Sequence, residues 1–288
     1  MTLRFGTAGI PRSTKGSDAE SGIRRVRELG LDHMEMEWVH RVSVNPDKGS
    51  SVSAVAEECD VTLTAHGPYY INLNSDDPKK VEASIKRVLD TARQGSYCGA
   101  KSVLFHAAFM MKRDPEEVYV TVRDRLKQIM NTLRKENISI DVRPELMGKP
   151  SQWGSLEEII RVSKELDGIK PAVDFSHQHA RTGGEFNTYE EFRSMLEAIK
   201  NGLGRQALKD MHIHVSGIKY GPKGEREHLN FADADFNWRD LIKAFVDYDV
   251  EGYCVCESPN LEEDALTMQR AYRKLTGKKN GQRVEPST

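Results

Sequence analysis

The chain has 288 residues, of which 42 are Lys or Arg and 44 are Asp or Glu, so its formal net charge is −2. About 38% of the residues are hydrophobic and 30% are charged, which is typical of a globular protein and excludes collagen-like and low-complexity chains. The near-zero charge also argues against a protein that binds nucleic acid through an extended basic surface alone. The length suits one α/β barrel or two average domains.

The cysteine content and the apolar runs indicate in which cellular compartment the protein is expected. Four cysteines in a chain of this length do not form a disulfide framework, which favours a reducing environment. The first residues, MTLRFGTAGIPRSTKGSD, lack the apolar core of a secretory signal, and no run approaches the roughly 20 apolar residues of a membrane helix. We therefore expect a cytoplasmic protein without a membrane partner, and we expect it to be a monomer.

Short apolar runs alternate with longer amphipathic segments along the chain. The runs have the length of buried strands and lie at residues 3–6, 33–37, 62–66, 102–106, 139–145, 170–174, 210–214 and 252–257. Helical periodicity marks residues 18–29, 78–95, 115–135, 155–166, 189–203, 238–248 and 262–275. Ser155 and Glu158 form a capping-box pattern at the start of one of these segments.

About eight strand-helix units predict a single (β/α)8 barrel with its active site at the carboxyl ends of the strands. A doubly wound open sheet is the rival, because βαβ alternation alone is common to both folds. No linker-like stretch divides the chain, so we predict one barrel domain over residues 1–276. Residues 277–288, GKKNGQRVEPST, are polar and aperiodic and are predicted to be a flexible tail.

Metal-ligand side chains stand at the ends of six predicted strands. Any one of them has an ordinary structural explanation, but six at the same topological position favour a metal site. They are His66, His106, Glu145, Asp174, His214 and Glu257. Because the carboxyl ends of barrel strands meet at one face, these side chains are expected to surround one point. Histidine together with carboxylate suits zinc or a similar divalent ion.

Further histidines follow these strand ends. His177 lies three residues after Asp174, with His179 next to it, and His228 lies in the segment after the seventh strand. These imidazoles exceed what one ion can use, which indicates a multinuclear site. A carboxylate such as Glu145 would then bridge two ions about 3.5–4 Å apart, as in two-metal phosphoryl chemistry.

The ordered set of motifs resembles the endonuclease IV family, also called AP endonuclease family 2, among the xylose isomerase-like barrels. The motifs are HGPYYINLNS at residues 66–75, the strand-end His106, PELMGKPSQWGS around Glu145, AVDFSH with Asp174 and His177, HIHVSG with the downstream His228, and ESP at Glu257. The resemblance runs in register from about residue 60 to residue 260. Its specificity rests on the combination, since each motif alone is weak.

The resemblance implies a zinc-dependent enzyme of DNA base excision repair. Its members hydrolyse the phosphodiester on the 5′ side of an abasic site and leave a 3′-hydroxyl, and the physical mechanism is attack by a metal-activated hydroxide. The implied partner is duplex DNA that contains abasic sites. Divalent ions would add positive charge that the formal net charge omits, so a near-neutral chain is compatible with this partner.

The resemblance also implies the roles of individual residues. His66 and His106 would hold one zinc ion together with Glu145, which would bridge to a second ion and act as the catalytic carboxylate. Asp174, a histidine of the seventh strand and Glu257 would complete the second site. His177 and His228 would belong to a third. Tyr69 corresponds to an aromatic residue that the family wedges into the duplex, and Tyr70 beside it is a second candidate for stacking on DNA.

Two positions depart from the family pattern or leave it open. The family has an Asp two residues before the last histidine, where this chain has Arg226; Glu225 and Glu227 flank it as possible substitutes. The seventh strand carries both His212 and His214, which point the same way because they are two residues apart. Alignment of HVSG favours His214, which we predict to be the ligand, with His212 as the alternative.

Two predictions concern the barrel wall. If Glu257 faces the barrel axis, Cys254 and Cys256 face the outer helices, and we interpret them as small buried apolar residues. In HMEMEW, residues 33–38, outward methionines would turn Glu35 and Glu37 inward. Buried carboxylates need partners, and we predict an interior ion pair between Arg143 and one of these glutamates.

Three functions remain open from the sequence. The first is zinc-dependent hydrolysis of damaged DNA. The second is a sugar isomerase or epimerase of the same superfamily, which would use Glu145, Asp174, the seventh-strand histidine and Glu257 around one Mn²⁺ or Mg²⁺ ion. That chemistry has no need of the four further histidines. The third is a member that has lost catalysis and only binds nucleic acid or metal, against which the complete ligand set argues.

Overall fold

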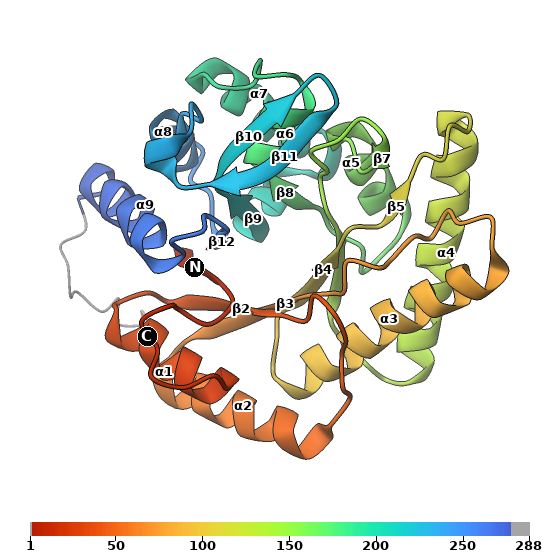
Figure 1. The fold of residues 1–288 in the computed structure, drawn as a ribbon, viewed down its shortest axis with the longest axis horizontal. Coiled ribbons are helices and arrows are strands. Elements are labelled where there is room, and N and C mark those ends of the chain that lie inside the picture. The colour runs from red at the N-terminus through yellow and green to blue at the C-terminus, as the bar shows by residue number, and fades with distance from the viewer. Residues whose placement is uncertain (1, 278–288) are drawn as a thin grey trace.

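Eight parallel strands form a barrel at the centre of the computed structural model, which describes residues 2–277 (Figure 1). The strands are β1 (Leu3–Ala8), β2 (His33–Glu37), β3 (Thr62–His66), β4 (Ser102–Phe105), β6 (Asp141–Pro144), β8 (Ala172–Asp174), β9 (Met211–Val215) and β12 (Gly252–Cys256). Their spatial order is β6-β4-β3-β2-β1-β12-β9-β8, with parallel pairing throughout. Parallel bridges Val142–Ile169 and Glu145–Ala172 connect the two end strands. The predicted barrel is confirmed, and the open sheet is wrong.

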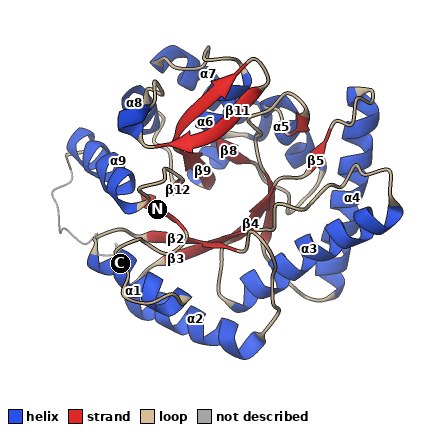
Figure 2. Ribbon diagram, viewed as in Figure 1, coloured by secondary structure: helices blue, strands red, loops and turns tan. Residues whose placement is uncertain are grey.

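A helix follows each barrel strand and covers the outside of the barrel (Figure 2). Within residues 2–277 these helices are α1 (Ala19–Glu28), α2 (Pro46–Cys59), α3 (Pro78–Tyr97), α4 (Pro115–Lys135), α5 (Leu156–Glu165), α7 (Tyr189–Leu203), α8 (Trp238–Asp247) and α9 (Glu262–Leu275). The sequence missed α2, because its segment PDKGSSVSAVAEEC has few large apolar residues to mark a helical period. Asn45 and Pro46 at its start are the signal that could have revealed it.

Side-chain caps fix where several helices begin. Asn45, Asp77 and Asp114 each accept a backbone N–H of the first turn, and each is followed by a proline at the first helical position. The capping box predicted for Ser155 and Glu158 is confirmed at the start of α5. These starts matter for the site, because they fix the length of the loops that lead from the strand ends.

The hydrophobic core lies between the strands and the covering helices. It includes Cys254 and Cys256, which are free, fully buried and packed with apolar neighbours, as predicted for residues that face away from the barrel axis. Their strand neighbours Tyr253 and Val255 alternate with them and face the interior. Within the described residues, no helix is long and apolar enough to cross a membrane.

A short helix and two small antiparallel strand pairs lie at the carboxyl end of the barrel, outside the repeated strand-helix units. A short helix, α6 (Phe175–Arg181), starts directly after β8, and two small antiparallel pairs join β5 (Ala108–Phe109) with β7 (Gln152–Trp153) and β10 (Gly217–Gly221) with β11 (Gly224–Leu229). The β10–β11 hairpin projects from the end of β9 (Figure 1). Of the tail predicted at residues 277–288, all but residue 277 lies outside the described residues.

Candidate metal centre

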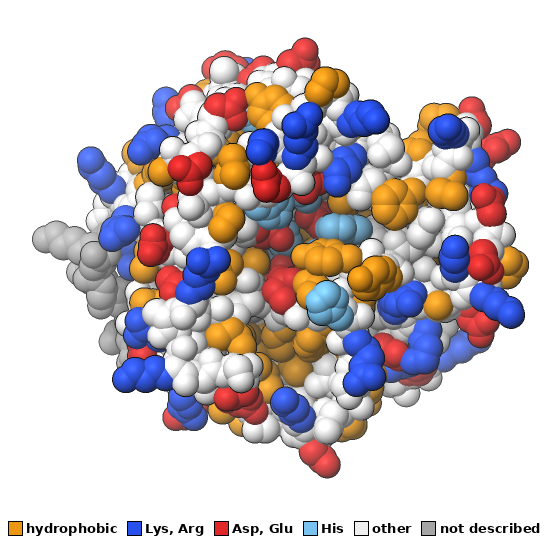
Figure 3. All heavy atoms as spheres, in the orientation of Figure 1, with side chains coloured by type: hydrophobic (Ala, Val, Ile, Leu, Met, Phe, Trp, Pro, Cys, Tyr) orange, Lys and Arg blue, Asp and Glu red, His pale blue; other side chains and the backbone are white. Residues whose placement is uncertain are grey.

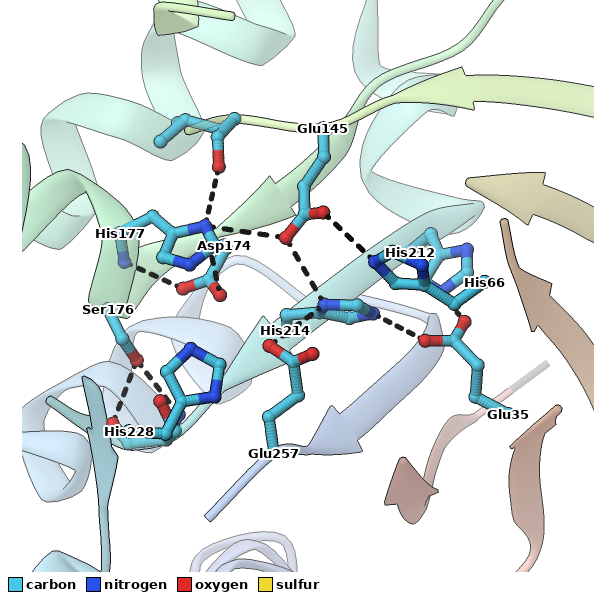
Figure 4. A network of polar contacts seen from close by, with 12 residues as sticks. Glu35, His66, Glu145, Asp174, Ser176, His177, His212, His214, His228 and Glu257 are labelled. Carbon is cyan, nitrogen blue, oxygen red and sulfur yellow. Dashed lines mark hydrogen bonds and ion pairs between the residues drawn. The ribbon is translucent and has the colours of Figure 1, made fainter. Parts of the chain in front are cut away.

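The six predicted strand-end residues meet at the carboxyl end of the barrel. His66, Glu145, His214 and Glu257 turn toward one another from the ends of four different strands, with Asp174 beside them (Figure 4). Together with His106, His177 and His228 they form three overlapping groups whose ligand atoms lie within 4.8 Å of one another. The groups are His66–His106–Glu145, Glu145–Asp174–His214–Glu257, and Asp174–His177–His228.

The first group places two imidazoles against one oxygen of Glu145. The Nε2 atoms of His66 and His106 lie 3.6 Å and 3.1 Å from Oε2 of Glu145. Nδ1 of His66 lies 2.7 Å from the carbonyl oxygen of Gly67, so we assign the proton to Nδ1 and the lone pair to Nε2. A metal-ligating histidine usually donates one ring N–H to a partner such as a carbonyl oxygen and turns its other nitrogen toward the metal, and His66 has this arrangement.

Glu145 turns its other oxygen to the second group. Oε1 of Glu145 lies 3.4 Å from Nδ1 of His214, which in turn lies 3.1 Å from Oε2 of Glu257. Asp174 caps helix α6, because its Oδ1 accepts the backbone N–H of His177 at 2.8 Å, and Oδ2 remains free of hydrogen bonds. Glu145 therefore offers one oxygen to each group, as a bridging carboxylate would.

The third group is built by helix α6 and the β10–β11 hairpin. Nδ1 of His177 lies 2.9 Å from the carbonyl oxygen of Leu146, which leaves Nε2 to face the hairpin. The rings of His177 and His228 lie 5.7 Å apart, centre to centre. Asp174 reaches the same pair of histidines with its carboxylate. The carboxylate of Asp174 is thus shared by the second and third groups.

A bulge in the hairpin decides which acidic residue faces the histidines. Lys219 pairs with Glu227 and Tyr220 pairs with Glu225, so Arg226 has no partner across the hairpin. Successive side chains in a strand alternate between two faces, and one unpaired residue shifts that alternation. The shift turns Glu225 to the face that Arg226 would occupy in a regular strand.

Glu225 consequently lies beside the third group. Its Oε2 is 3.6 Å from Nε2 of His177 and its Oε1 is 3.9 Å from Nε2 of His228, while its side chain is 16% exposed. Glu227 is exposed and forms an ion pair with a lysine of the hairpin. The guanidinium group of Arg226 packs against the glycine that ends β10. Of the two alternatives left open by the sequence, Glu225 is the one brought to the site.

The two histidines of β9 lie at different depths. His214 belongs to the second group, whereas His212 lies nearer the interior, with Nε2 at 2.8 Å from Glu35 and Nδ1 at 3.0 Å from the hydroxyl of Ser102. Both ring nitrogens of His212 therefore face partners within the barrel wall. His214 thus lies with the other candidate ligands, and His212 lies one layer below them.

The predicted ion pair of Arg143 with Glu35 or Glu37 is wrong. Arg143 is 1% exposed, but it lies at the opposite end of the barrel, where it forms ion pairs with Asp141 at 3.2 Å and Asp210 at 3.1 Å. Alternation gave its inward direction correctly but not its depth, because Arg143 stands one layer below Glu145 on the strand. The partners of Glu35 are instead His212 and His214.

Burial and the crowding of charges shift the pKa values of the site. Burial alone would lower the pKa of His66, but the carboxylates of Glu145 and Glu37 outweigh it and raise this pKa to about 10. Burial raises the pKa of Asp174 to about 8 and that of Glu37 to about 8. Burial also opposes ionisation of Glu145, yet the surrounding imidazoles hold the pKa of its carboxyl well below the usual range.

The residues present fit bound divalent ions. Both oxygens of Glu145, Oδ2 of Asp174, Nδ1 of His214 and Oε2 of Glu257 are buried without a hydrogen-bond partner. Buried polar atoms are nearly always satisfied, so this cluster of ligand atoms calls for a further group. Within residues 2–277, no Lys or Arg forms an ion pair with any carboxylate of the site. These carboxylates are Glu35, Glu37, Glu145, Asp174, Glu225 and Glu257.

The site opens to solvent at the centre of the barrel face. Figure 3 shows histidine and acidic side chains in a hollow on this face, with hydrophobic side chains along its rim. Tyr69 and Tyr70, in the loop after β3, are 48% and 65% exposed. The ring of Tyr69 is stacked on that of His106, with centroids 5.4 Å apart. The loop thus presents aromatic surface directly beside the first group.

The fold and the site define the class of the protein. A family model described as the xylose isomerase-like TIM barrel matches residues 23–275, and the chain belongs to this family. Over most of its length the chain is similar to an uncharacterized protein of Methanocaldococcus jannaschii, with 41% identity over 275 residues that cover 96% of this chain and 98% of that protein.

Other relatives and structures fall into two functional groups. A probable endonuclease 4 of Geobacillus sp. is 24% identical over 181 residues, which cover 60% of this chain and 58% of that protein. Endonuclease IV from Thermus thermophilus superposes with a TM-score of 0.72 at 17% identity, covering 95% of this chain and all of that one. A D-tagatose 3-epimerase-like protein superposes with a TM-score of 0.73 at 16% identity, covering 96% and 97%. At these identities the superpositions show the fold alone.

Proposed function

We propose that the protein is a zinc-dependent phosphodiester hydrolase that cleaves duplex DNA on the 5′ side of abasic sites. The observation that carries the proposal is the set of three overlapping ligand groups at the barrel mouth. Imidazoles from five positions and carboxylates from four lie together there, which exceeds the four to six ligands of a single ion. The similarity to probable endonuclease 4 proteins supports the same function.

The ligand assignment follows the geometry of the three groups. His66, His106 and Glu145 would hold one ion, and Glu145, Asp174, His214 and Glu257 a second. His177 and His228 would hold a third ion together with an oxygen of Asp174 or Glu225. Histidine with carboxylate is a donor set that suits Zn²⁺. Ions in these places would supply Lewis-acid stabilisation of a phosphodiester and lower the pKa of water.

The chain's own residues prepare this chemistry. Glu145 keeps its carboxylate ionised among the imidazoles, and the hydrogen bonds from His66 to Gly67 and from His177 to Leu146 fix the ring orientations. The cap between Asp174 and helix α6 leaves one carboxylate oxygen for the cluster. The surrounding strands therefore hold the donor atoms before a substrate arrives, which is the preorganisation that electrostatic catalysis requires.

The rim of the hollow supports DNA as the partner. An abasic nucleotide has lost its base stacking, so its rotation out of the duplex costs less than that of an intact nucleotide. Tyr69 and Tyr70 present exposed aromatic surface beside the metal centre, where stacking would fill the gap left by the lesion. The near-neutral net charge indicates that the lesion and the metal centre, rather than a basic surface, supply most of the selectivity.

A sugar isomerase or epimerase is the second candidate, favoured by one specific observation. Glu145, Asp174, His214 and Glu257 form a four-ligand group on their own, which is sufficient for one Mn²⁺ or Mg²⁺ ion, and epimerases are among the structural neighbours. The remaining histidines have no role in that reaction. His66 and His106 nevertheless turn their Nε2 atoms toward Glu145, which favours the hydrolase.

Metal analysis together with an activity assay tests the proposal. We expect the purified protein to contain more than one equivalent of zinc per chain and to nick a duplex with a single abasic site, leaving a 3′-hydroxyl. The intact duplex of the same sequence serves as the control. One equivalent of Mn²⁺ or Mg²⁺, no nicking and the interconversion of ketose sugars would instead establish the isomerase or epimerase.

A further inference from the structure

A buried polar layer lies directly beneath the candidate metal centre, and none of its residues is among the ligands proposed above. It is formed by side chains of β2, β3, β4 and β9 that point into the barrel, and its members are His33, Glu35, Thr64, Ser102 and His212. All five are 0% exposed. Burial of so many polar groups costs free energy unless each is matched to a partner, so their mutual arrangement is informative.

Glu35 is the centre of this layer. Its Oε2 accepts the hydroxyl of Thr64 at 2.7 Å and lies 2.8 Å from Nε2 of His212. Its Oε1 lies 2.8 Å from Nε2 of His214 (Figure 4). Thr64 is in turn 3.0 Å from Nε2 of His33. The carboxylate is thus held in place from two sides and offers one whole oxygen to His214.

The two nitrogens of His214 consequently have different neighbours. Nε2 faces the single oxygen of Glu35, whereas Nδ1 faces Glu145 and Glu257 in the second ligand group. An ionised carboxylate beside one ring nitrogen favours a proton there, so the other nitrogen keeps its lone pair when the ring binds a metal ion. From these contacts, and resting on the metal binding proposed above, we propose that Glu35 is a positioning residue, whose carboxylate lies against Nε2 of His214 and turns Nδ1 toward the metal centre.

The same contact explains why only one of the two histidines of β9 faces the site. His212 uses Nε2 toward Glu35 and Nδ1 toward Ser102, so neither nitrogen is left for a metal ion. His214 uses one nitrogen toward Glu35 and keeps the other. The contacts with Glu35 therefore explain why His212 and His214, two histidines of the same strand, have different roles.

The ligand atoms of Glu35, His212 and His214 are also close enough to be considered a metal site of their own. The two nitrogen-oxygen distances are 2.8 Å. Ligands with bonds of roughly 2.0–2.1 Å to a tetrahedral ion would stand about 3.3 Å apart, so these atoms lie closer together than such an ion would hold them. The His212→Gln variant described below tests this directly.

The first test is which ring nitrogen of His214 carries the proton in the zinc-loaded wild-type protein, where the nitrogen that binds zinc carries none. Long-range ¹H–¹⁵N spectra of ¹⁵N-histidine-labelled protein distinguish a protonated from an unprotonated ring nitrogen, and the His214→Gln spectrum assigns the signal. We expect the proton on Nε2. A proton on Nδ1 would overturn the proposal, and this measurement needs no variant of Glu35 to fold.

The second test is zinc affinity in Glu35→Gln, which keeps the shape of the side chain and removes its charge. We expect the affinity of one site to fall by about 10- to 100-fold, as is usual when the partner of a metal-ligating histidine is lost, while the other sites are unchanged. A competition titration with a chromophoric chelator measures this. Unaltered affinity at every site, in a variant that melts like the wild type, would mean that Glu35 serves the barrel wall only.

His212→Gln is the matched control. It removes the other histidine on Glu35 but leaves the contact with His214, so we expect the zinc stoichiometry to stay at the wild-type value. Loss of one zinc equivalent in this variant would show that Glu35, His212 and His214 bind an ion themselves, which contradicts the proposal. These measurements also stand apart from DNA cleavage: a protein that never nicks DNA would refute the proposed function and leave the role of Glu35 intact.

Discussion

The two ends of the barrel both carry buried charges, but they balance them differently. At the amino end, Arg143 and Lys170 lie among Asp141 and Asp210, with nitrogen-oxygen distances of 2.6–3.2 Å. Arg143 also donates to the carbonyl oxygen of Pro171 at 3.2 Å. Two cations thus meet two anions, and the cluster neutralises itself.

At the carboxyl end, the carboxylates face histidines instead. The acids around Glu145 have no Lys or Arg partner within the described residues, and several of their oxygens lack any hydrogen bond. Carboxylates that face imidazole nitrogens are neutralised either by protons on those rings or by divalent ions. This difference indicates that the charged cluster of the amino end stabilises the fold. The carboxylates and histidines of the carboxyl end are instead arranged to bind a further group.

Glu145→Gln at the carboxyl end is expected to have the largest effect. Loss of the carboxylate shared by two ligand groups should lower the zinc content and reduce nicking of an abasic duplex by about 10³-fold, since a single lost electrostatic contact in a reacting site already costs about 10²–10³-fold. Zinc analysis and a gel-based nicking assay measure both effects.

Asp141→Asn at the amino end is the control for Glu145→Gln. It also removes one negative charge from the barrel, at a partly exposed side chain far from the ligand groups, so zinc content and nicking should persist. Full zinc content in Glu145→Gln would show that Glu145 does not bridge two ions, and the contrast between the two ends would fail.

Removal of metal should lower the stability of the protein, because the carboxyl end depends on ions and the amino end does not. If zinc completes the carboxyl end, chelation should lower the free energy of unfolding by about 3–4 kcal/mol relative to protein with free zinc at 100 to 1,000 times its dissociation constant. Thermal denaturation with and without a chelator measures the difference. Equal melting temperatures in both conditions would show that the negative charge of these carboxylates is neutralised without metal ions.

The pH dependence of stability should change sign with the metal. Without metal, Asp174 and Glu37 have pKa values raised to about 8 and His66 one raised to about 10. Between pH 7 and 9 the unfolded chain has already lost these protons while the folded protein still holds them, so the free energy of unfolding falls as the pH rises. With zinc, ligands must be deprotonated to bind, so the stability should rise over the same range. Parallel slopes in the two titrations would contradict this.

A smaller effect is expected from Arg143→Met at the amino end. The substitution leaves the carbonyl oxygens of Pro171 and residue 210 without their donor, but Lys170 still pairs with both aspartates. We expect a loss of about 1–3 kcal/mol in the free energy of unfolding, measured by urea denaturation. The zinc content should not change; a fall in it would mean that the two ends are coupled.

The sequence predicted the fold because each strand-helix unit repeats the same apolar pattern. It missed helix α2, whose many small and polar residues carry little periodicity. It also missed the two small antiparallel pairs, β5–β7 and β10–β11, whose strands are too short or too polar to be marked. Alternation in β6 gave the direction of Arg143 but not its layer. Depth in a barrel depends on the stagger between strands, which a single sequence does not encode.

The candidate site was predictable where its residues follow a strand end. Only the position of each strand was needed to predict His66, His106 and Glu145, and the structure brings these three residues together. Glu225 could not be chosen over Glu227, because the choice depends on a bulge at Arg226. The partners of Glu35 could not be found either, since they come from strands far apart in the sequence. Contacts of this kind depend on the register between strands.

The smallest expected effect tests whether the rim of the carboxyl end contacts DNA. Tyr69 and Tyr70 are neighbours, yet Tyr69 stacks on His106 at the centre, whereas the carbonyl of Tyr70 is held by Arg87 at the outside. Tyr69→Ala should raise the Kd for an abasic duplex about tenfold, because one aromatic stack contributes roughly 1–3 kcal/mol. Tyr69→Phe keeps the ring and should bind as the wild type does. Fluorescence anisotropy with abasic and intact duplexes measures this; equal weakening for both would show a general contact rather than one that reads the lesion.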